Sequence, residues 1–494
     1  MATVVQEEVV GKIAFNTDTS LTMKMHEAQQ LWASTTMRDR LKVLRAARHG
    51  LASTVHALSQ SISPELTRTV ADTMVAEIMP LLDACRFLER VAESTLARRR
   101  LGRRRLPFWL AGISSEIHRV PLGLVLVIGP SNYPLFLPGV QALQGLAAGN
   151  AVIWKPGRGG RAVADLFAQA MESAGLPPDL LRVTDETVTA TYAALHERPD
   201  KVFFTGSAAT GRALMREMAE TLTPCVMELS GCDAVVVLPS AGMSRVVKAL
   251  AFGMRLNGSA TCMAPRRVLL VDATPARREI FLSALQKELS QVGTARISEG
   301  VRQHLRELLD EAVRAGARVY GDVDAQEIAP VVVTDVQPSM NLAQADIFAP
   351  LLVIIDVVGE GGVLAAQQAC PFALTASVFG AEVEARRLAA KMTAGTVLVN
   401  DVIVPTADPR VPFGGRRESG FGVTRGAEGL LEMTAVKTIA VRRSQRTRHY
   451  EATTFAHERL FGGLIAVTHA KRWVERWNGL KQIVSAGRKL ENKR

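Results

Sequence analysis

Cys262, Glu228 and Asn132 supply a thiol, a carboxylate and an amide, which are groups that nucleophilic catalysis uses. Cys262 lies in NGSATCMAPRR and is one of five cysteines in the chain. A thiolate is a strong nucleophile, but most free cysteines are buried and inert, so the thiol alone leaves both interpretations open. Glu228 in CVMELSG precedes Cys262 by 34 residues, and Asn132 lies earlier still, in GPSNYP.

Polar residues follow three apolar, β-branched runs, at the points where strands are expected to end. Asn132 follows LVLVIG, Lys155 ends NAVIWK, and Gly206 and Ser207 follow KVFFT. Continuous apolar runs are typical of strands buried on both faces, and the helical intervals between them predict a parallel α/β sheet. Right-handed crossovers bring the carboxyl ends of parallel strands to one edge, where ligands bind. We therefore expect these residues and Glu228 to lie near one another.

The segment FTGSAATGR is similar to a phosphate-binding turn. Gly206 permits close approach of the backbone, and Ser207 can cap a helix whose amino end attracts anions. Thr210 and Gly211 complete the segment, but it is not a G-x-G-x-x-G motif, and Gly-Ser also simply starts helices. A cofactor site and an ordinary helix start both remain open for this segment alone.

Length and composition indicate a globular protein. The 494 residues are enough for two or three domains, and 48% of them are apolar and 22% charged. Five cysteines form no disulfide framework, which favours a reducing, cytoplasmic compartment. We expect no signal peptide in MATVVQEEVVGK and no membrane span, because the apolar runs are about eight residues long. The nine histidines form no ligand cluster, so no metal is implied.

Positive charge is concentrated at the carboxyl end of the chain. The net charge is +11, of which +9 falls from Arg442 onward and only +2 on the preceding residues. A nearly neutral body argues against nucleic-acid binding. A second basic cluster, RRRLGRRRLP at residues 98–107, is most simply a solvated helix end followed by a turn.

The pattern of elements predicts interlocked α/β domains. Residues 23–100 place apolar residues three and four apart with few Gly or Pro, which predicts helices. A second α/β portion begins near residue 232, with strand candidates DAVVVLPS, RRVLLVD, LLVIIDV, TASVFG and GTVLVN. No Ser/Gly-rich linker separates the two portions.

Nine segments in order resemble the motifs of the aldehyde dehydrogenase superfamily, over residues 28–439. They are PLGLVLVIGPSNYPLFLP, LAAGNAVIWKP, FFTGSAATGR, MELSG, NGSATCMAPRRV, ADIFAPLLVI, LTASVFG, VLVND and PFGGRRESGFG with GLLEMTAVKT. The resemblance implies an NAD(P)-dependent aldehyde dehydrogenase that oxidises an aldehyde to a carboxylic acid, with NAD or NADP as cofactor.

The resemblance also implies an α/β fold in which a Rossmann-type cofactor domain interlocks with an α/β catalytic domain. The expected cofactor domain is 1–102 and 122–229, and the expected catalytic domain is 230–431. A small bridging sheet from 103–121 and 432–443 is expected to pair subunits, which implies a homodimer or a higher oligomer. Residues 444–494 form a basic extension.

In the aldehyde dehydrogenase superfamily a cysteine thiol attacks the aldehyde, so the resemblance implies that Cys262 is the nucleophile. It makes Asn132, with the backbone N–H of Cys262, the donor to the oxyanion, and Glu228 the base that activates water for thioester hydrolysis. The implied cofactor-binding residues are Lys155, Arg158, Gly206, Ser207, Thr210, Gly211, Asp346 and Phe348. The implied substrate-pocket residues are Tyr133, Val140 and Phe413, which indicate an apolar aldehyde.

The sequence departs from the family pattern at several of these sites. Ser259 and Ala260 replace Gly-Gln ahead of the thiol, and Asp346 replaces a glutamate with the same charge on a shorter arm. Arg158 replaces a glutamate that accepts hydrogen bonds from the adenosine ribose. A guanidinium can bind a 2′-phosphate, so NADP becomes plausible, although Arg158 could equally point to solvent.

Two other functions remain open on the sequence. A coenzyme-A-acylating dehydrogenase would release the thioester to a thiol, but Glu228 argues against it because that transfer needs no water-activating base. A catalytically weak member acting as a binding or scaffold protein is permitted by the departures. Retention of Cys262, Glu228, Asn132 and Lys155 together argues against it.

The tail extends about fifty residues beyond the family pattern. Trp473, Trp477, Leu480 and Val484 recur at helical spacing among Lys and Arg residues. Such a pattern is typical of a helix at an anionic membrane surface, which would give peripheral membrane contact, but an apolar stripe also packs on protein. Gly462 and Gly463 interrupt the pattern, so we expect the helix to start after them.

Overall fold

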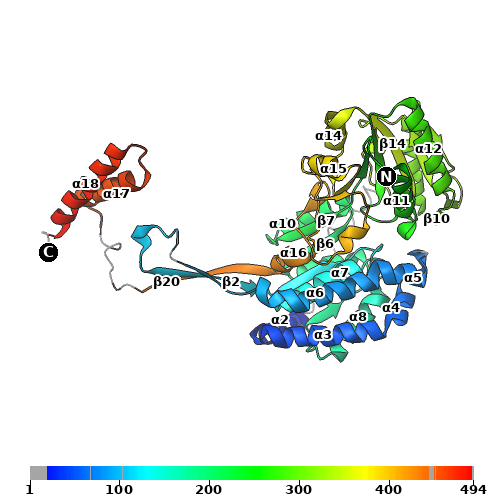
Figure 1. The fold of residues 1–494 in the computed structure, drawn as a ribbon. Coiled ribbons are helices and arrows are strands. Elements are labelled where there is room, and N and C mark those ends of the chain that lie inside the picture. The colour runs from blue at the N-terminus through cyan, green and yellow to red at the C-terminus, as the bar shows by residue number, and fades with distance from the viewer. Residues whose placement is uncertain are drawn as a thin grey trace. The chain divides into compact units, whose positions relative to one another are not determined.

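The structure of the chain is a computed structural model that describes residues 19–491 apart from 67, 103, 444, 446–449 and 451. Contacts between residues divide it into two compact units (Figure 1). The first unit is Met1–Arg98 with His118–Lys437, and the second is Arg99–Ile117 with Thr438–Arg494.

Helices form the amino-terminal part of the first unit, as the apolar spacing predicts. They are α2 (Thr19–Ser34), α3 (Met37–Ser53), α4 (Val55–Ser61), the turn η2 (Pro64–Leu66), α5 (Val70–Thr73), the π-helical η3 (Met74–Ile78) and α6 (Met79–Thr95). Thr36 caps α3, because its side chain accepts a hydrogen bond from the Asp39 N–H. Apolar side chains at Leu81, Ala84 and Leu88 bury one face of α6, which packs on α3 and α7 (Figure 1).

A six-stranded sheet follows, in the order β19-β7-β6-β3-β4-β5. Its strands are β3 (Leu124–Ile128), β4 (Ala151–Lys155), β5 (Leu181–Val183), β6 (Lys201–Gly206), β7 (Cys225–Leu229) and β19 (Gly420–Phe421). The helices between them are α7 (Phe136–Ala148), α8 (Arg161–Ser173), α9 (Val188–His196) and α10 (Ala208–Ala219). Strands β3 to β7 run parallel, and β3 and β4 are buried at every residue.

A second sheet of seven strands has the order β11-β13-β14-β9-β8-β16-β17. Its strands are β8 (Asp233–Val237), β9 (Pro265–Val271), β11 (Arg318–Tyr320), β13 (Val331–Thr334), β14 (Leu351–Val357), β16 (Thr375–Phe379) and β17 (Thr396–Val399). Its helices are α11 (Met243–Arg255), α12 (Pro275–Leu289), α13 (Glu299–Arg314), α14 (Gly359–Ala369) and α15 (Glu382–Ala389). Side chains of alternate strand residues pack into two apolar cores, one on each face of the sheet.

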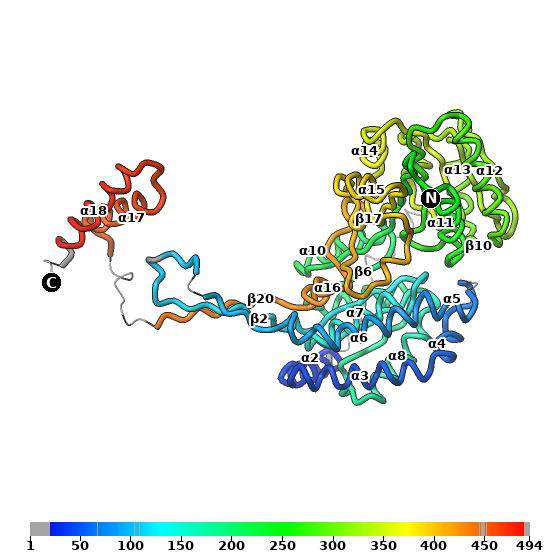
Figure 2. Tube along the Cα trace, viewed as in Figure 1, coloured from blue at the N-terminus to red at the C-terminus, as the bar shows by residue number. Residues whose placement is uncertain are grey.

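The chain then returns from the second sheet to the first. Strand β19 pairs antiparallel with β7, and α16 (Gly426–Glu432) packs on α6 and α7 (Figure 2). This unit also contains two short two-stranded pairs, β10 (Ala295–Arg296) with β12 (Glu327–Ile328) and β15 (Phe372–Ala373) with β18 (Arg416–Arg417). The two sheets are thus joined both by the step from β7 to β8 and by this return, which makes the α/β domains interlocked.

A three-stranded sheet has the order β1-β2-β20. Its strands are β1 (Arg99–Leu101), β2 (Ile113–Pro121) and β20 (Thr434–Arg442), and β1 runs antiparallel to β2. Strands β2 and β20 fall within the two ranges predicted for the bridging element.

The second unit ends in a hairpin of two helices, α17 (Phe455–His469) and α18 (Trp473–Glu491). The helix that carries Trp473 and Trp477, α18, begins after Gly462 and Gly463 as predicted, but the glycines do not interrupt helical structure, because a separate helix, α17, runs through both. The reason is close packing: a Cβ on Gly463 would lie 2.6 Å from the Gly479 carbonyl oxygen of α18. The glycines thus let two helix backbones meet, and they do not break either helix.

Candidate active site

Cys262 lies on a tightly turned loop between α11 and β9. Asn257, Gly258 and Ser259 all adopt left-handed backbone conformations, with φ of 55°, 56° and 65°. The buried Arg266 side chain donates to the Ser259 hydroxyl at 2.6 Å and to the Ala349 carbonyl at 3.1 Å. Ser259, one of the departures from the family pattern, therefore holds the loop through its hydroxyl group.

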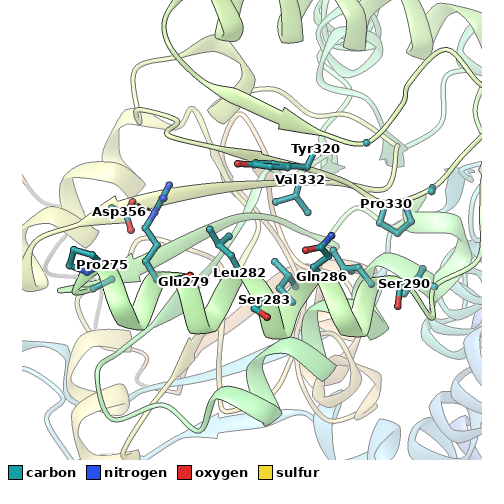
Figure 3. Close-up of a pocket in the computed structure, with 17 residues that line it drawn as sticks. Pro275, Glu279, Leu282, Ser283, Gln286, Ser290, Tyr320, Pro330, Val332 and Asp356 are labelled. Atoms are coloured by element: carbon teal, nitrogen blue, oxygen red, sulfur yellow. Dashed lines mark hydrogen bonds and ion pairs between the residues drawn. The ribbon is translucent and has the colours of Figure 1, made fainter.

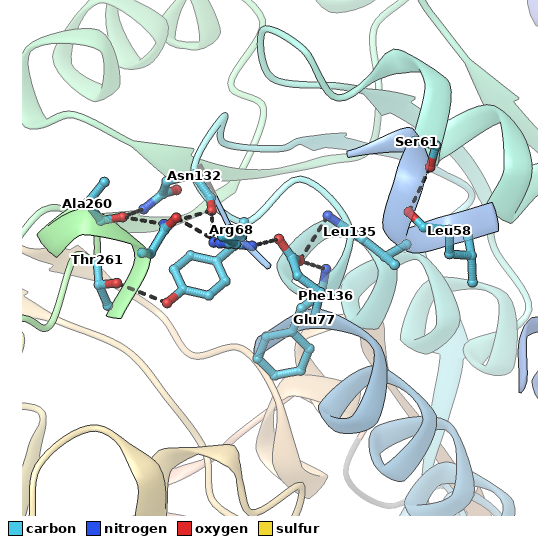
Figure 4. Close-up of polar contacts among 11 residues, drawn as sticks. Leu58, Ser61, Arg68, Glu77, Asn132, Leu135, Phe136, Ala260 and Thr261 are labelled. Atoms are coloured by element: carbon cyan, nitrogen blue, oxygen red, sulfur yellow. Dashed lines mark hydrogen bonds and ion pairs between the residues drawn. The ribbon is translucent and has the colours of Figure 1, made fainter. Parts of the chain in front are cut away.

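Asn132 lies against this loop, as the strand-end argument predicts. Its side-chain nitrogen donates to the Ala260 carbonyl at 2.9 Å (Figure 4). The Asn257 amide donates to the Asn132 carbonyl at 3.1 Å. Beside it, the hydroxyl groups of Tyr133 and Thr261 are 2.9 Å apart. The end of β3 is thus hydrogen-bonded to both residues that immediately precede Cys262.

Glu228 is buried in β7, opposite Gly420 of β19. One carboxylate oxygen accepts a hydrogen bond from the Thr424 hydroxyl at 3.4 Å, and the other has no partner among the described residues. The chain after β7 passes directly over the Cys262 loop: a Cβ on Gly231 would lie 2.8 Å from the Cys262 carbonyl oxygen. Only glycine fits this crossing, which brings the Glu228 strand and the Cys262 loop together.

Burial and nearby acids disfavour negative charge at Cys262. Burial is the largest cause that raises the pKa of the thiol, and Glu228, Asp233 and Asp346 raise it further, while Arg425 opposes them. Burial also raises the pKa of Glu228. The thiolate and the Glu228 carboxylate therefore disfavour each other, and the pair favours a single negative charge.

Arg425 is a residue that the sequence analysis missed. Its side chain is buried, donates to the Thr406 carbonyl at 2.7 Å and stacks on the Phe413 ring at 4.2 Å. Nε and Nη2 have no hydrogen-bond partner within the described part of the chain. Its positive charge lowers the pKa of both Cys262 and Glu228. In the sequence, Arg425 is a single arginine in the segment GVTRGAEG, and nothing in that segment indicates that its side chain is buried.

The turn after β6 has the geometry of a helix amino terminus. Ser207 caps α10 and accepts a hydrogen bond from the Thr210 N–H at 3.2 Å. Gly206 and Gly211 are required by packing, because their Cβ atoms would lie 2.4 Å from the Phe204 ring and 2.8 Å from Leu229. The exposed amino end of a helix of this length suits an anionic group.

Lys155, the last residue of β4, and Arg158, in the loop that follows, have different environments. Lys155 is buried, and burial lowers its pKa, opposed by Glu186 and Asp185. The Arg158 side chain is 79% exposed and lies 3.5 Å from the Glu65 carboxylate. Between them, Gly157 packs on the Pro130 backbone, with only 2.3 Å available to a Cβ. The loops after β3 and β4 are therefore locked together.

Asp346 precedes Phe348, and both are half-buried. One Asp346 carboxylate oxygen is shielded from solvent and lacks a partner among the described residues. Burial raises the Asp346 pKa, while Ser230 and Arg266 oppose the shift. An orphaned acceptor of this kind fits a ligand hydroxyl group, as the expected cofactor ribose would supply.

Tyr133, Val140 and Phe413, the expected substrate-pocket residues, are all buried. Tyr133 and Phe413 lie beside groups of the site, through Thr261 and Arg425 respectively. Val140 is on α7, among the apolar side chains that pack beneath the first sheet. Contact of these three side chains with an aldehyde remains a prediction.

A separate groove lies between α12 and the β11, β13 and β14 strands. Leu282 and Gln286 line its helix side, and Tyr320 and Val332 line its sheet side (Figure 3). None of the predicted site residues lines this groove. Across the described residues, no group of three His, Cys, Asp or Glu side chains could hold a metal ion.

The chain matches the aldehyde dehydrogenase family over residues 5–439. It belongs to this family. The 4,4'-diapolycopene aldehyde oxidase of Methylomonas sp is 30% identical over 427 residues, which cover 83% of this chain and 79% of the relative. A probable coniferyl aldehyde dehydrogenase of Pseudomonas aeruginosa is 32% identical over 422 residues, with 81% and 86% covered.

A solved structure of a Mycobacterium tuberculosis aldehyde dehydrogenase complexed with NAD+ has a similar fold. Its TM-score is 0.76 at 25% identity, and the match covers 84% of this chain and 88% of that one. The predicted family and α/β fold are therefore confirmed. This aldehyde dehydrogenase oxidises an aldehyde to a carboxylic acid.

Replacing Glu228 by Gln should lower the pKa of Cys262, because it removes a negative charge beside the thiol. At pH values above the pKa of Glu228, iodoacetamide should then alkylate Cys262 faster, and the pH profile of alkylation should shift to lower pH. Mass spectrometry of the peptide that contains Cys262 measures the rate. Glu172→Gln, an exposed change on α8, is the control and should leave the profile unchanged. An unchanged or raised pKa in Glu228→Gln would contradict this coupling.

Proposed function

We propose that Cys262 is the nucleophile, that Asn132 and the Cys262 backbone N–H bind the oxyanion, and that Glu228 is the base. The Cys262 sulfur attacks the aldehyde carbon, and the oxygen becomes an alkoxide next to the two N–H donors. NAD(P)+ supplies the hydride acceptor, and hydride loss leaves a thioester on Cys262. Glu228 takes a proton from water, the hydroxide displaces the sulfur, and the carboxylic acid is released. The contacts between the Asn132 segment and the Cys262 loop carry this proposal.

The single negative charge of the Cys262–Glu228 pair gives the two steps an order. When the thiolate forms, Glu228 can hold the proton, which favours the attack. Once the thioester has formed, the sulfur is neutral, and Glu228 can ionise and act as the base. Glu228 next to the thiol also argues against the coenzyme-A-acylating alternative, since transfer to a thiol needs no activated water.

The residues around the first sheet fit a dinucleotide. We assign the pyrophosphate to the amino end of α10, at Gly206, Ser207, Thr210 and Gly211. Lys155 and Arg158 would bind the adenosine side. Asp346, through its orphaned oxygen, and Phe348 would bind the nicotinamide side.

Substitution of the nucleophile and the base tests the assignment. Cys262→Ala should abolish aldehyde oxidation while NAD+ still binds. Glu228→Gln should release one equivalent of reduced cofactor in a burst and then stall, because the thioester cannot be hydrolysed. Stopped-flow absorbance of the reduced cofactor measures both results. Steady-state turnover at the wild-type rate in either variant would refute the assigned role.

The exposed guanidinium of Arg158 suits the 2′-phosphate of NADP. A lost charge-assisted hydrogen bond weakens binding by about 1.5–3 kcal/mol, or about tenfold or more. Arg158→Glu should therefore lower kcat/KM for NADP relative to NAD, and Glu65→Gln, which frees Arg158 from its ion pair, should not. An unchanged ratio of the two cofactors' kcat/KM values in Arg158→Glu would show that Arg158 faces solvent.

We propose an apolar aldehyde as substrate, because Tyr133, Val140 and Phe413 offer apolar surface. The relatives named above act on diapolycopene aldehyde and coniferyl aldehyde by their names. The β1-β2-β20 sheet is the element that we propose pairs subunits into a homodimer or a higher oligomer. All five cysteines lie in the described residues and are unbridged, which suits the proposed cytoplasmic location.

The hairpin of α17 and α18 lies beyond the family match, which ends at residue 439. No helix in the described residues is long and apolar enough to cross a bilayer. Trp473, Trp477, Leu480 and Val484 follow one side of α18, and Trp473 is 75% exposed. Arg472, Arg476, Lys481 and Arg488 are interspersed with them. We propose that this basic, apolar surface makes peripheral contact with an anionic membrane.

Co-sedimentation with phosphatidylglycerol vesicles at low salt tests membrane contact. The intact chain should sediment, and a chain ending at Arg443 should not, while both oxidise a water-soluble aldehyde equally. Trp473→Ser with Trp477→Ser should weaken binding, whereas Trp109→Ser, at an exposed tryptophan outside the hairpin, should not. Failure of the intact chain to sediment, or lower stability of the truncated chain, would favour packing of the hairpin on protein instead.

A further inference from the structure

Arg68 and Glu77 form a buried ion pair at the amino end of α7. The Arg68 side chain is only 3% exposed and Glu77 is fully buried, and Nη1 lies 2.7 Å from Glu77 Oε1. The other Glu77 oxygen accepts the Phe136 N–H at 2.7 Å and the Leu135 N–H at 3.2 Å. The pair therefore fixes Arg68 to the first turn of the helix that follows Asn132 (Figure 4).

The remaining donors of Arg68 bind groups that hold the proposed catalytic residues in place. Nε donates to the Asn257 side-chain oxygen at 2.7 Å, and Nη2 donates to the Asn132 carbonyl. The guanidinium also lies 4.7 Å from the centre of the Tyr133 ring. One planar group thus contacts both the end of β3 and the loop that carries Cys262.

Arg68 also determines the orientation of the Asn257 amide. Because a guanidinium only donates, the Asn257 oxygen must face Arg68, and its nitrogen must face the other way. That nitrogen donates to the carbonyls of Asn132 and Ala260, and the Ala260 carbonyl also accepts from the Asn132 side chain. The position of the Asn132 amide therefore depends on a chain of hydrogen bonds that begins at Arg68.

We propose that Arg68 is a positioning residue for aldehyde oxidation, which sets the Asn132 amide and the Cys262 loop for binding of the oxyanion. This inference rests on the proposed function, because it acts through Asn132. It goes further by assigning the reaction a residue on the amino-terminal helical segment, 64 positions before Asn132. No other described residue donates to the Glu77 carboxylate, the Asn257 side chain and the Asn132 carbonyl together.

Arg68→Lys tests the role without leaving Glu77 unpaired. Lysine can keep the ion pair, but one ammonium cannot serve Asn257 and Asn132 at the same time. Stopped-flow absorbance of the reduced cofactor formed in the first turnover, here called the burst, measures the rate of the first hydride transfer. This rate should fall about 10- to 100-fold, since small displacements of reacting groups have effects of this size. NAD+ binding and Tm should stay close to wild type.

A double-mutant cycle with Asn132→Ala separates positioning from general damage. If Arg68 acts through Asn132, Arg68→Lys should slow the burst in the wild-type background and have little further effect in Asn132→Ala. An equal loss in both backgrounds, or an unchanged burst rate in Arg68→Lys, would overturn the proposal. If Asn132→Ala itself kept full activity, the proposed function would fail, which is a distinct result.

Arg40 provides a matched control. It is also a buried arginine, and it donates to the carbonyls of Thr35 and Ala147 away from the site. Arg40→Lys should lower Tm and leave the burst rate unchanged. If Arg68→Lys does not fold, Arg68→Met with Glu77→Gln removes both charges together. That pair should fold and show the same slow burst, and a wild-type burst in it would equally overturn the proposal.

Discussion

Only Ser230, Gly231 and Cys232 separate β7 of the first sheet from β8 of the second, and this short step passes directly over the Cys262 loop. The step fixes the distance between the two sheets, because three residues offer little freedom. It also leaves no room for a side chain at Gly231. Glu228 at one end of the step and the Cys262 loop are consequently held together by the backbone, before any side-chain contact is considered.

Buried charge is the second organising feature of the site. The negative charges of Glu228, Asp233 and Asp346 all raise the pKa of the Cys262 thiol. Arg425 opposes them with a guanidinium of which two nitrogens have no hydrogen-bond partner among the described residues. Burial of a charged group without full hydrogen bonding is unfavourable for folding, and groups of this kind cluster at functional sites.

Local sequence pattern predicted the parts of this protein that depend on strand ends and turns. Asn132, Lys155, Ser207 and Glu228 follow apolar runs, and the topology of a parallel sheet brings such residues together. Nothing local marks Arg68 or Arg425. Arg68 donates to Asn257, which is 189 positions away in the chain. Arg425 lowers the pKa of Glu228, which lies on strand β7 of the first sheet. Burial of a charged side chain is a tertiary property.

The helical hairpin is a second feature that the local sequence did not predict correctly. Two adjacent glycines are usual signs of a helix boundary, and here they mark the place where two helix backbones meet. Because Gly463 and Gly479 hold the helices together by backbone contact, the large outward-facing residues of α18 take no part in that contact. Mutation can therefore change the outer surface of the hairpin without loss of its fold. The residues that determine what the hairpin binds can therefore diverge during evolution while the enzyme to which it is attached remains the same.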